Sequence, residues 1–244
     1  LILAMLWFLV GGRTHKEIEI KLMPASKIVI WLALATVAGV YIYFENINFV
    51  RADYYYLLAK KAAKAGDCNG ILDNMKQAVG YAPAGNYYKE QYIFHGLNCF
   101  PAVVGQDSLS ALRDNIAAQI KLINPREYQY STWLTVARAY SLFGFYVDAA
   151  DYATAEKIFN NLIASYPKLL TSYQDLGRMK MWQKDYGSAI SLFNQAEKNL
   201  PPLNQPQLNQ DHRDKIAAET VSLYEKLGYS YNKIKNYGKA LKYY

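Results

Sequence analysis

The chain has 244 residues, of which 52% are hydrophobic and 15% aromatic, and its formal net charge is +7 at pH 7. This basic surplus does not indicate a nucleic-acid partner, because the basic residues flank apolar segments or are spread along helices, and the sequence has no RNA- or DNA-binding motif. Because the chain begins with Leu1 and ends at Tyr244 inside a repeat, we interpret it as an internal piece of a larger protein.

The N-terminal part of the chain contains two apolar segments. Residues 1–12 are interpreted as the end of a transmembrane helix rather than as a signal peptide, because they lack a Met start and a basic n-region. Residues 28–48 are predicted to form a transmembrane helix, since 28–44 has no charge and no polar stripe and carries aromatic rings near its ends. This run is at the short end of the ~20 residues needed to cross a bilayer core.

The loop between these segments predicts an orientation. Short basic loops stay on the cytoplasmic side of a membrane, and residues 13–27 form such a loop. Its basic residues are Arg13, Lys16, Lys21 and Lys27. We therefore expect the repeat domain, residues 49–244, to lie outside the cytoplasm.

From residue 52 onward the sequence repeats a two-helix pattern. In the clearest copy, Leu176-Gly177 lies in a first helix, and Ala189 and Phe193 follow in a second helix. The spacing from the Leu-small pair to the second helix is the same between positions 176 and 189, 227 and 240, and 58 and 71. We expect the small residues to let the two helices of a repeat approach closely, so that a Leu at position 177 or 189 would cost ~1–3 kcal/mol.

The copies keep the pattern to different degrees. The second is degenerate, with a helix predicted over 86–100 and a following helix, to about residue 123, capped by Asp107 or Ser108. The third has extra residues around 145–152, which either lengthen its helices by a turn or more or widen the turn between them. The predicted copies span about 52–85, 86–125, 130–167, 170–203 and, truncated, 221–244.

The two cysteines lie in the first two copies. Cys68 opens the second helix of the first copy, and Cys99 ends the first helix of the second copy. Stacked helices could bring the two residues together, and a disulfide would fit an oxidising exterior. Two unpaired small core residues are the equally weighted alternative.

The period and the spacing resemble those of the tetratricopeptide repeat (TPR) family over residues 52–244. The resemblance implies an all-α fold, in which one or two N-terminal transmembrane helices precede a TPR-like right-handed α-solenoid. Members of this family mediate protein–protein interactions, so a protein or peptide partner is expected.

The wider layout resembles a second family. An apolar helix end, a basic loop, one span and an array that starts directly with residues 51–56 (RADYYY) are similar to the C-terminal part of bacterial O-antigen ligase or polymerase-like membrane proteins with repeat tails. This resemblance implies a bacterial inner or cytoplasmic membrane and an extracytoplasmic repeat domain. In that family the glycan chemistry lies in upstream spans and an external loop, so no catalytic residue can be carried over.

The sequence shows no catalytic, cofactor or metal site of its own. His15, His95 and His212 are far apart and lack His or Cys neighbours at metal-binding spacing. Nucleophile-elbow, phosphate-loop and zinc-protease motifs are also missing. Whether the parent protein is an enzyme stays open.

A binding surface follows from the TPR resemblance, because first helices of that family line a concave groove. The residue after each small position and the residue four places earlier are expected on this face. The candidates are Tyr56, Lys60, Leu134, Arg138, Gln174, Arg178, Glu225 and Tyr229. The basic row formed by Lys60, Arg138 and Arg178 suits an anionic partner, such as a carboxylate-bearing peptide or an acidic glycan, although solubilising surface charge is the alternative. Changing both arginines to Glu is expected to abolish partner capture without melting the fold.

Two functions fit the sequence. In the first, the repeats are the recognition or assembly module, for protein or glycan, of an O-antigen ligase-like envelope protein. In the second, they form a membrane-anchored, non-enzymatic scaffold for envelope protein complexes. The sequence does not indicate the oligomeric state.

Overall fold

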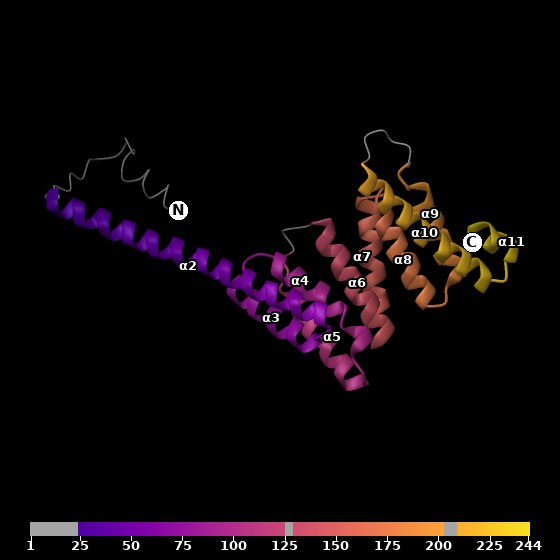
Figure 1. Cartoon of the computed structure of the whole chain (residues 1–244), viewed down its shortest axis with the longest axis horizontal. Coiled ribbons are helices and arrows are strands. Elements are labelled where there is room, and N and C mark those ends of the chain that lie inside the picture. Colours follow the sequence, from indigo (N-terminus) through magenta and orange to yellow (C-terminus); the bar gives the residue numbers. More distant parts are fainter. Residues whose placement is uncertain (1–23, 125–128, 203–208) are drawn as a thin grey trace. The chain divides into compact units, whose positions relative to one another are not determined.

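The computed structural model describes residues 24–124, 129–202 and 209–244, and within them every regular element is a helix (Figure 1). This confirms the predicted all-α fold class. The predicted helix end at 1–12 and nearly all of the basic loop at 13–27 lie outside the described residues.

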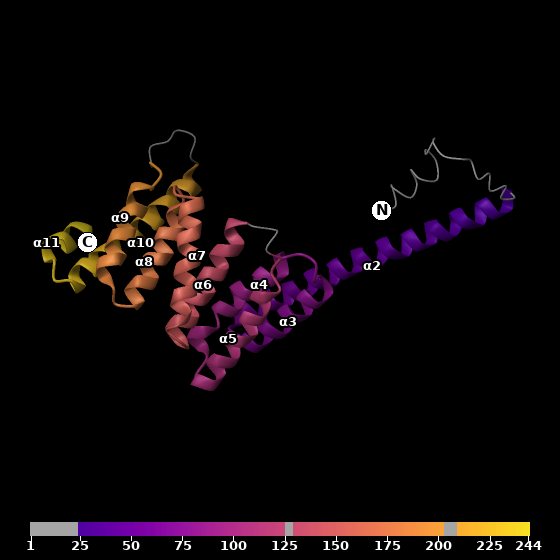
Figure 2. The same cartoon turned by 180° about the vertical axis from the view of Figure 1, so that it is seen from behind.

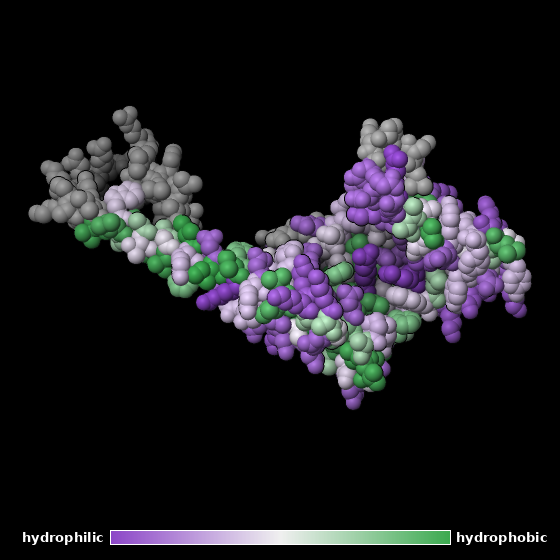
Figure 3. Space-filling model, in the orientation of Figure 1, coloured by the Kyte–Doolittle hydropathy of each residue, from purple (hydrophilic) through white to green (hydrophobic). Residues whose placement is uncertain are grey.

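The chain divides into two compact units, residues 1–47 and 48–244, and helix α2 (Pro24–Ala65) contributes residues to both. In the first unit most of the described apolar side chains of α2 are exposed, as for Val37 with 68% of its surface accessible. Apolar residues accordingly lie along this part of the helix surface (Figure 3). By length and composition, Val29–Ala65 could cross a membrane, and its most apolar window has a mean hydropathy of 1.5 and is not buried. The span predicted at 28–48 remains a prediction.

The second unit is built from pairs of antiparallel helices. Figure 2 shows the same succession of helices as Figure 1 from behind, so neighbours in the chain are also neighbours in space. The first helices of the pairs are the end of α2, α4 (Tyr87–Leu97), α6 (Tyr130–Tyr146), α8 (Leu170–Trp182) and α10 (Gln210–Lys233). The second helices are α3 (Cys68–Tyr81), α5 (Gln106–Lys121), α7 (Asp151–Ser165), α9 (Tyr186–Lys198) and α11 (Tyr237–Tyr243).

Close approach within a pair depends on the small residues that the repeat pattern singled out. Gly177 of α8 lies against Phe193 of α9, and Ala189 is fully buried beside the same ring in the core. In the other pairs, Ala59, Ala137, Ala155 and Ala240 are also buried. The expected role of the small residues is thus borne out by their positions.

The turns within the regular pairs share one backbone conformation. Gly66, Lys184 and Lys235 have positive φ angles of 71°, 63° and 60° and occupy equivalent positions in their repeats. The residue after each of them caps the second helix through its side chain, as Asp185 does by accepting a hydrogen bond from the Ser188 amide at 3.1 Å. The first of these turns, Gly66-Asp67, joins α2 to α3.

The second pair differs from its prediction in two ways. Helix α4 ends at Leu97 instead of continuing to residue 100, and a short 3-10 helix, η1 (Phe100–Ala102), follows. Helix α5 begins at Gln106, so neither Asp107 nor Ser108 caps it. Gly105 holds the cap position with a φ of 93°, a conformation that glycine adopts at little cost.

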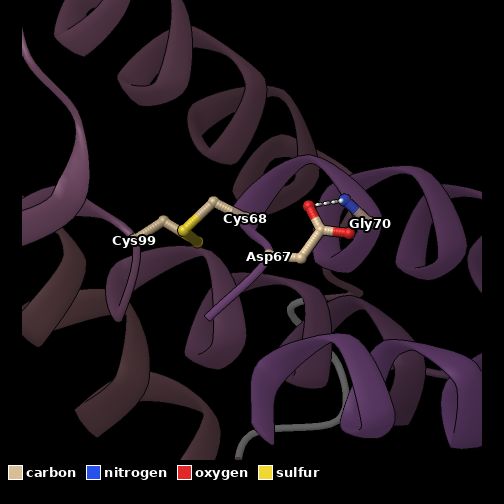
Figure 4. Close-up of a disulfide and its surroundings, with 4 residues drawn as sticks. All are labelled: Asp67, Cys68, Gly70 and Cys99. Atoms are coloured by element: carbon tan, nitrogen blue, oxygen red, sulfur yellow. Dashed lines mark hydrogen bonds between the residues drawn. A yellow bond between two sulfur atoms is a disulfide. The ribbon is translucent and has the colours of Figure 1, made fainter. Parts of the chain in front are cut away.

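The cysteines of the first two pairs form a disulfide. Cys68, at the start of α3, is bonded to Cys99, just after α4, and their Cα atoms are 5.7 Å apart (Figure 4). The preceding residue, Asp67, caps α3 by accepting a hydrogen bond from the Gly70 amide at 2.9 Å. The disulfide therefore ties the tight turn of the first repeat to the end of the next first helix, which decides between the two sequence alternatives.

Candidate functional site

The predicted binding residues lie on first helices, but they do not form one uniform row. Arg138, Gln174, Arg178, Glu225 and Tyr229 belong to three first helices that follow one another, α6, α8 and α10. We call the side of these helices that carries these residues the first-helix face. Residues three or four positions apart share one side of a helix, which explains why the pairs 174/178 and 225/229 occur together.

Side-chain contacts join helices α6 and α8 near their starts, their middles and their ends. The hydroxyl oxygens of Tyr130 and Ser172 are 3.0 Å apart near the start of both helices. Arg138 Nε donates to the Asp175 carboxylate at 2.6 Å in the middle, and the rings of Phe145 and Trp182 are 5.0 Å apart near the ends. The first-helix face is therefore a defined surface on which side-chain positions are fixed by neighbours.

Asp175 is the organising residue that the sequence prediction missed. It is 8% exposed, and its second oxygen accepts a hydrogen bond from Arg178 Nη2 at 2.9 Å. One carboxylate thus orients both arginines of the predicted basic row. Because this partnership depends on how α6 and α8 stack, no sequence spacing within one repeat could have indicated it.

Two hydrogen-bond donors on this face are left without a protein acceptor. Among the described residues, nothing accepts from Arg178 Nε or Gln174 Nε2, although both atoms are buried. A buried donor without a partner costs about 1–3 kcal/mol. Because both atoms are buried, a partner's oxygen would reach them only after the side chains shift.

A third cation extends the pair of arginines onto α10. Lys226 Nζ donates to Ser222 Oγ at 2.5 Å. Burial lowers the pKa of the Lys226 ammonium, and the nearby Arg178 lowers it further, against the opposing effect of Asp175 and Glu225. Lys226 of α10 therefore lies close enough to Arg178 of α8 for the two charges to repel each other. Lys226 was absent from the predicted set. That set held only the residue after each small position and the residue four places earlier, and Lys226 is neither of these.

Leu134 is a correction to the predicted set. It is 7% exposed and belongs to the core that includes Ala137, Phe159 and Leu176. An apolar side chain one turn before Arg138 packs inward between the helices, whereas the longer arginine reaches the surface. Leu134 is therefore not available to a partner.

The expectation about charge reversal also changes. Glu side chains at positions 138 and 178 would surround the buried Asp175 with like charges and leave its carboxylate without donors. The double reversal should therefore destabilise the fold, and neutral substitutions are the appropriate probes.

Tyr56 and Lys60 lie in a different, aromatic environment. The Tyr56 ring is 5.8 Å from Tyr87 and 6.1 Å from His95, and Lys60 Nζ is 5.4 Å from its centroid. The Tyr56 hydroxyl donates to Gln91 Oε1 at 3.0 Å. These contacts link α2 to α4, and Lys60 sits over a ring without joining the arginine pair.

In the described parts of the chain, no group of three or more His, Cys, Asp or Glu residues could hold a metal ion. No family model matches the sequence, and no curated protein sequence matches it either.

Solved structures do share the fold. A crystal structure of PilW, described as a widely conserved type IV pilus biogenesis factor, is 15% identical, with 91% of each chain covered and a TM-score of 0.51. A structure of MamA, residues 41 to the end, from Desulfovibrio magneticus RS-1 is 12% identical, with 79% of this chain and 90% of that chain covered and a TM-score of 0.50. Identities this low show the fold alone, which is an all-helical TPR-like fold.

Proposed function

We propose that the protein is a membrane-anchored TPR-like scaffold whose first-helix face binds an acidic segment of a protein partner. The observation that carries this proposal is the arrangement around Asp175. This buried carboxylate holds Arg138 and Arg178 in place, while 34% and 42% of the two arginine side chains stay exposed to a partner. Charge-assisted hydrogen bonds to a carboxylate are stronger than those between neutral groups.

Anchoring is supported by the first unit. A soluble protein would bury a helix segment as apolar as the first half of α2, yet most of its described side chains before residue 48 are exposed. The Cys68–Cys99 disulfide supports an extracytoplasmic location for the repeats, because such bonds persist in oxidising compartments. The proposed location is the outer side of a bacterial cytoplasmic membrane.

The layout that resembles O-antigen ligase-like proteins gives the scaffold a wider setting. In that setting the repeats assemble partners around an envelope glycan enzyme, and an acidic glycan becomes the competing ligand. The complete reading frame tests this setting: about ten further spans upstream would support it, and a start codon directly before Leu1 would favour an independent scaffold.

The binding proposal can be tested by photo-crosslinking in cells. A benzophenone amino acid replaces Tyr229, which is 40% exposed on α10, and a control replaces the exposed Asn160 on α7. We expect a protein crosslink from position 229 that is lost in Arg178→Gln and kept in Lys157→Gln, an exposed lysine on α7. A crosslink that survives Arg178→Gln unchanged would move the binding site elsewhere.

A further inference from the structure

The longer first helix of the third repeat adds an aromatic surface beside the cations. Helix α6 has 17 residues and α8 has 13, a difference of four residues and about one helical turn. This turn carries Phe145, which is 48% exposed and whose ring is 5.0 Å from the half-buried Trp182. The extra residues seen in the sequence of this repeat therefore lengthen α6.

This ring pair is continuous with the cationic part of the first-helix face. Trp182 lies one turn after Arg178, and the Arg178 guanidinium carbon is 5.4 Å from the Trp182 ring centroid. Phe145 lies two turns after Arg138 on α6. The Phe145–Trp182 contact therefore joins α6 to α8 two turns beyond the Arg138–Asp175 contact. A ligand held by Arg178 thus has an exposed aromatic ring within reach of its next side chain.

Single exposed apolar residues are normal on protein surfaces. Phe145 differs because a turn of helix places it against a second ring, Trp182, and that ring already contacts Arg178 of the proposed site.

The charges on this face indicate the chemistry of the ligand. The cations outnumber the carboxylates, which favours an acidic ligand. The cations are Arg138, Arg178 and Lys226, and the carboxylates are those of Asp175 and Glu225.

We infer that Phe145 and Trp182 form an apolar subsite of the first-helix face, and that the partner segment presents an acidic and an aromatic side chain together. This inference rests on the proposed function and specifies its ligand as an extended peptide. In an extended chain, residues two positions apart point to the same side, about 7 Å from each other. The Arg178 guanidinium carbon is 5.4 Å from the Trp182 ring centroid, so a carboxylate and a ring bound at these two places would fit residues at about this spacing.

Blocked synthetic peptides test the subsite on the full chain in detergent, with binding followed by fluorescence anisotropy. The first peptide has a phenylalanine with a glutamate two residues away on each side, so that either chain direction fits. The second replaces the phenylalanine with serine, and the third replaces both glutamates with glutamine. Acetyl and amide ends remove terminal charges as a competing signal.

We expect the first peptide to bind about tenfold more tightly than the serine peptide, since one buried aromatic side chain contributes that much or more. It should also bind more tightly than the glutamine peptide, because charge-assisted hydrogen bonds are stronger than those between neutral groups. Phe145→Ala should remove the advantage over the serine peptide and leave the serine peptide unaffected. The matched control is Phe94→Ala, which removes a ring with the same exposed fraction, 48%, from α4. Unfolding curves of both variants check that the fold is kept.

The outcomes separate the two proposals. If the first and second peptides bind equally and Phe145→Ala has no effect, the apolar subsite is wrong while the acidic-segment proposal stands. If the glutamine peptide binds as tightly as the first, charge does not select the ligand and both are wrong. Both also fail if no peptide binds, or if Arg178→Gln leaves binding of the acidic peptides unchanged.

Discussion

A Cβ atom added to Gly177 would lie 2.5 Å from Cε1 of Phe193, closer than side-chain carbons approach in folded proteins. Phe193 is fully buried, so its ring cannot move toward solvent. The pair fixes the distance between α8 and α9, and it shows why the pattern requires a small residue at this point.

Gly177→Ala should therefore destabilise the protein by about 1–3 kcal/mol, because the ring and the helix must move apart. The control is Gly80→Ala in α3, where an added Cβ meets nothing within 4 Å. That change should be neutral or stabilise by up to about 1 kcal/mol through helix propensity. Chemical denaturation measures both; equal effects of the two variants would contradict the proposed close contact.

Lys184 holds a backbone conformation that suits glycine better. Its φ of 63° matches the 71° of Gly66 at the equivalent turn, and a non-glycine residue in this region is strained by about 1–2 kcal/mol. We expect Lys184→Gly to stabilise the protein by up to about 1 kcal/mol and Lys184→Val to destabilise it. The loss of stability expected for Gly66→Ala provides the reverse test in the same denaturation assay.

The regular features of the fold were predictable because each repeat specifies them locally. The Leu-Gly pair at positions 176 and 177 and the Gly66-Asp67 turn act through neighbours within one repeat. Asp175 was not predictable, since its partner Arg138 belongs to the preceding repeat and the contact depends on how the repeats stack. The start of α5 was missed for a related reason: Gly105 ends the preceding loop by its backbone conformation, without a capping side chain.

The Cys68–Cys99 disulfide should contribute about 2–4 kcal/mol to stability, because it closes a loop with a sequence separation of 31 residues in the unfolded chain. Thermal unfolding with and without a reducing agent measures this contribution. The double variant Cys68→Ser with Cys99→Ser should unfold at the lower temperature in both conditions. An unchanged wild-type transition under complete reduction would show that the bond adds no stability.

Asp175→Asn tests the organising role of the buried carboxylate. The amide keeps the shape but loses the charge that holds Arg138 and Arg178, so we expect a loss of about 1–3 kcal/mol. Asp114→Asn is the control, because this carboxylate is paired with Arg113 at an exposed position, where an ion pair contributes about 0–1 kcal/mol. Similar losses in both variants would mean that Asp175 is an ordinary surface partner.

The proposed topology, which rests on the exposed apolar helix and the basic loop, can be tested with a single thiol. Both cysteines of the chain are in the disulfide, so Ser191→Cys, at an exposed position on α9, introduces a free thiol without removing the bond. We expect a membrane-impermeant maleimide to label this variant in intact cells or spheroplasts, and the wild type to stay unlabelled. A label that appears only after lysis would place the repeats in the cytoplasm. The predicted orientation of the span, with residues 13–27 on the cytoplasmic side, would then be wrong.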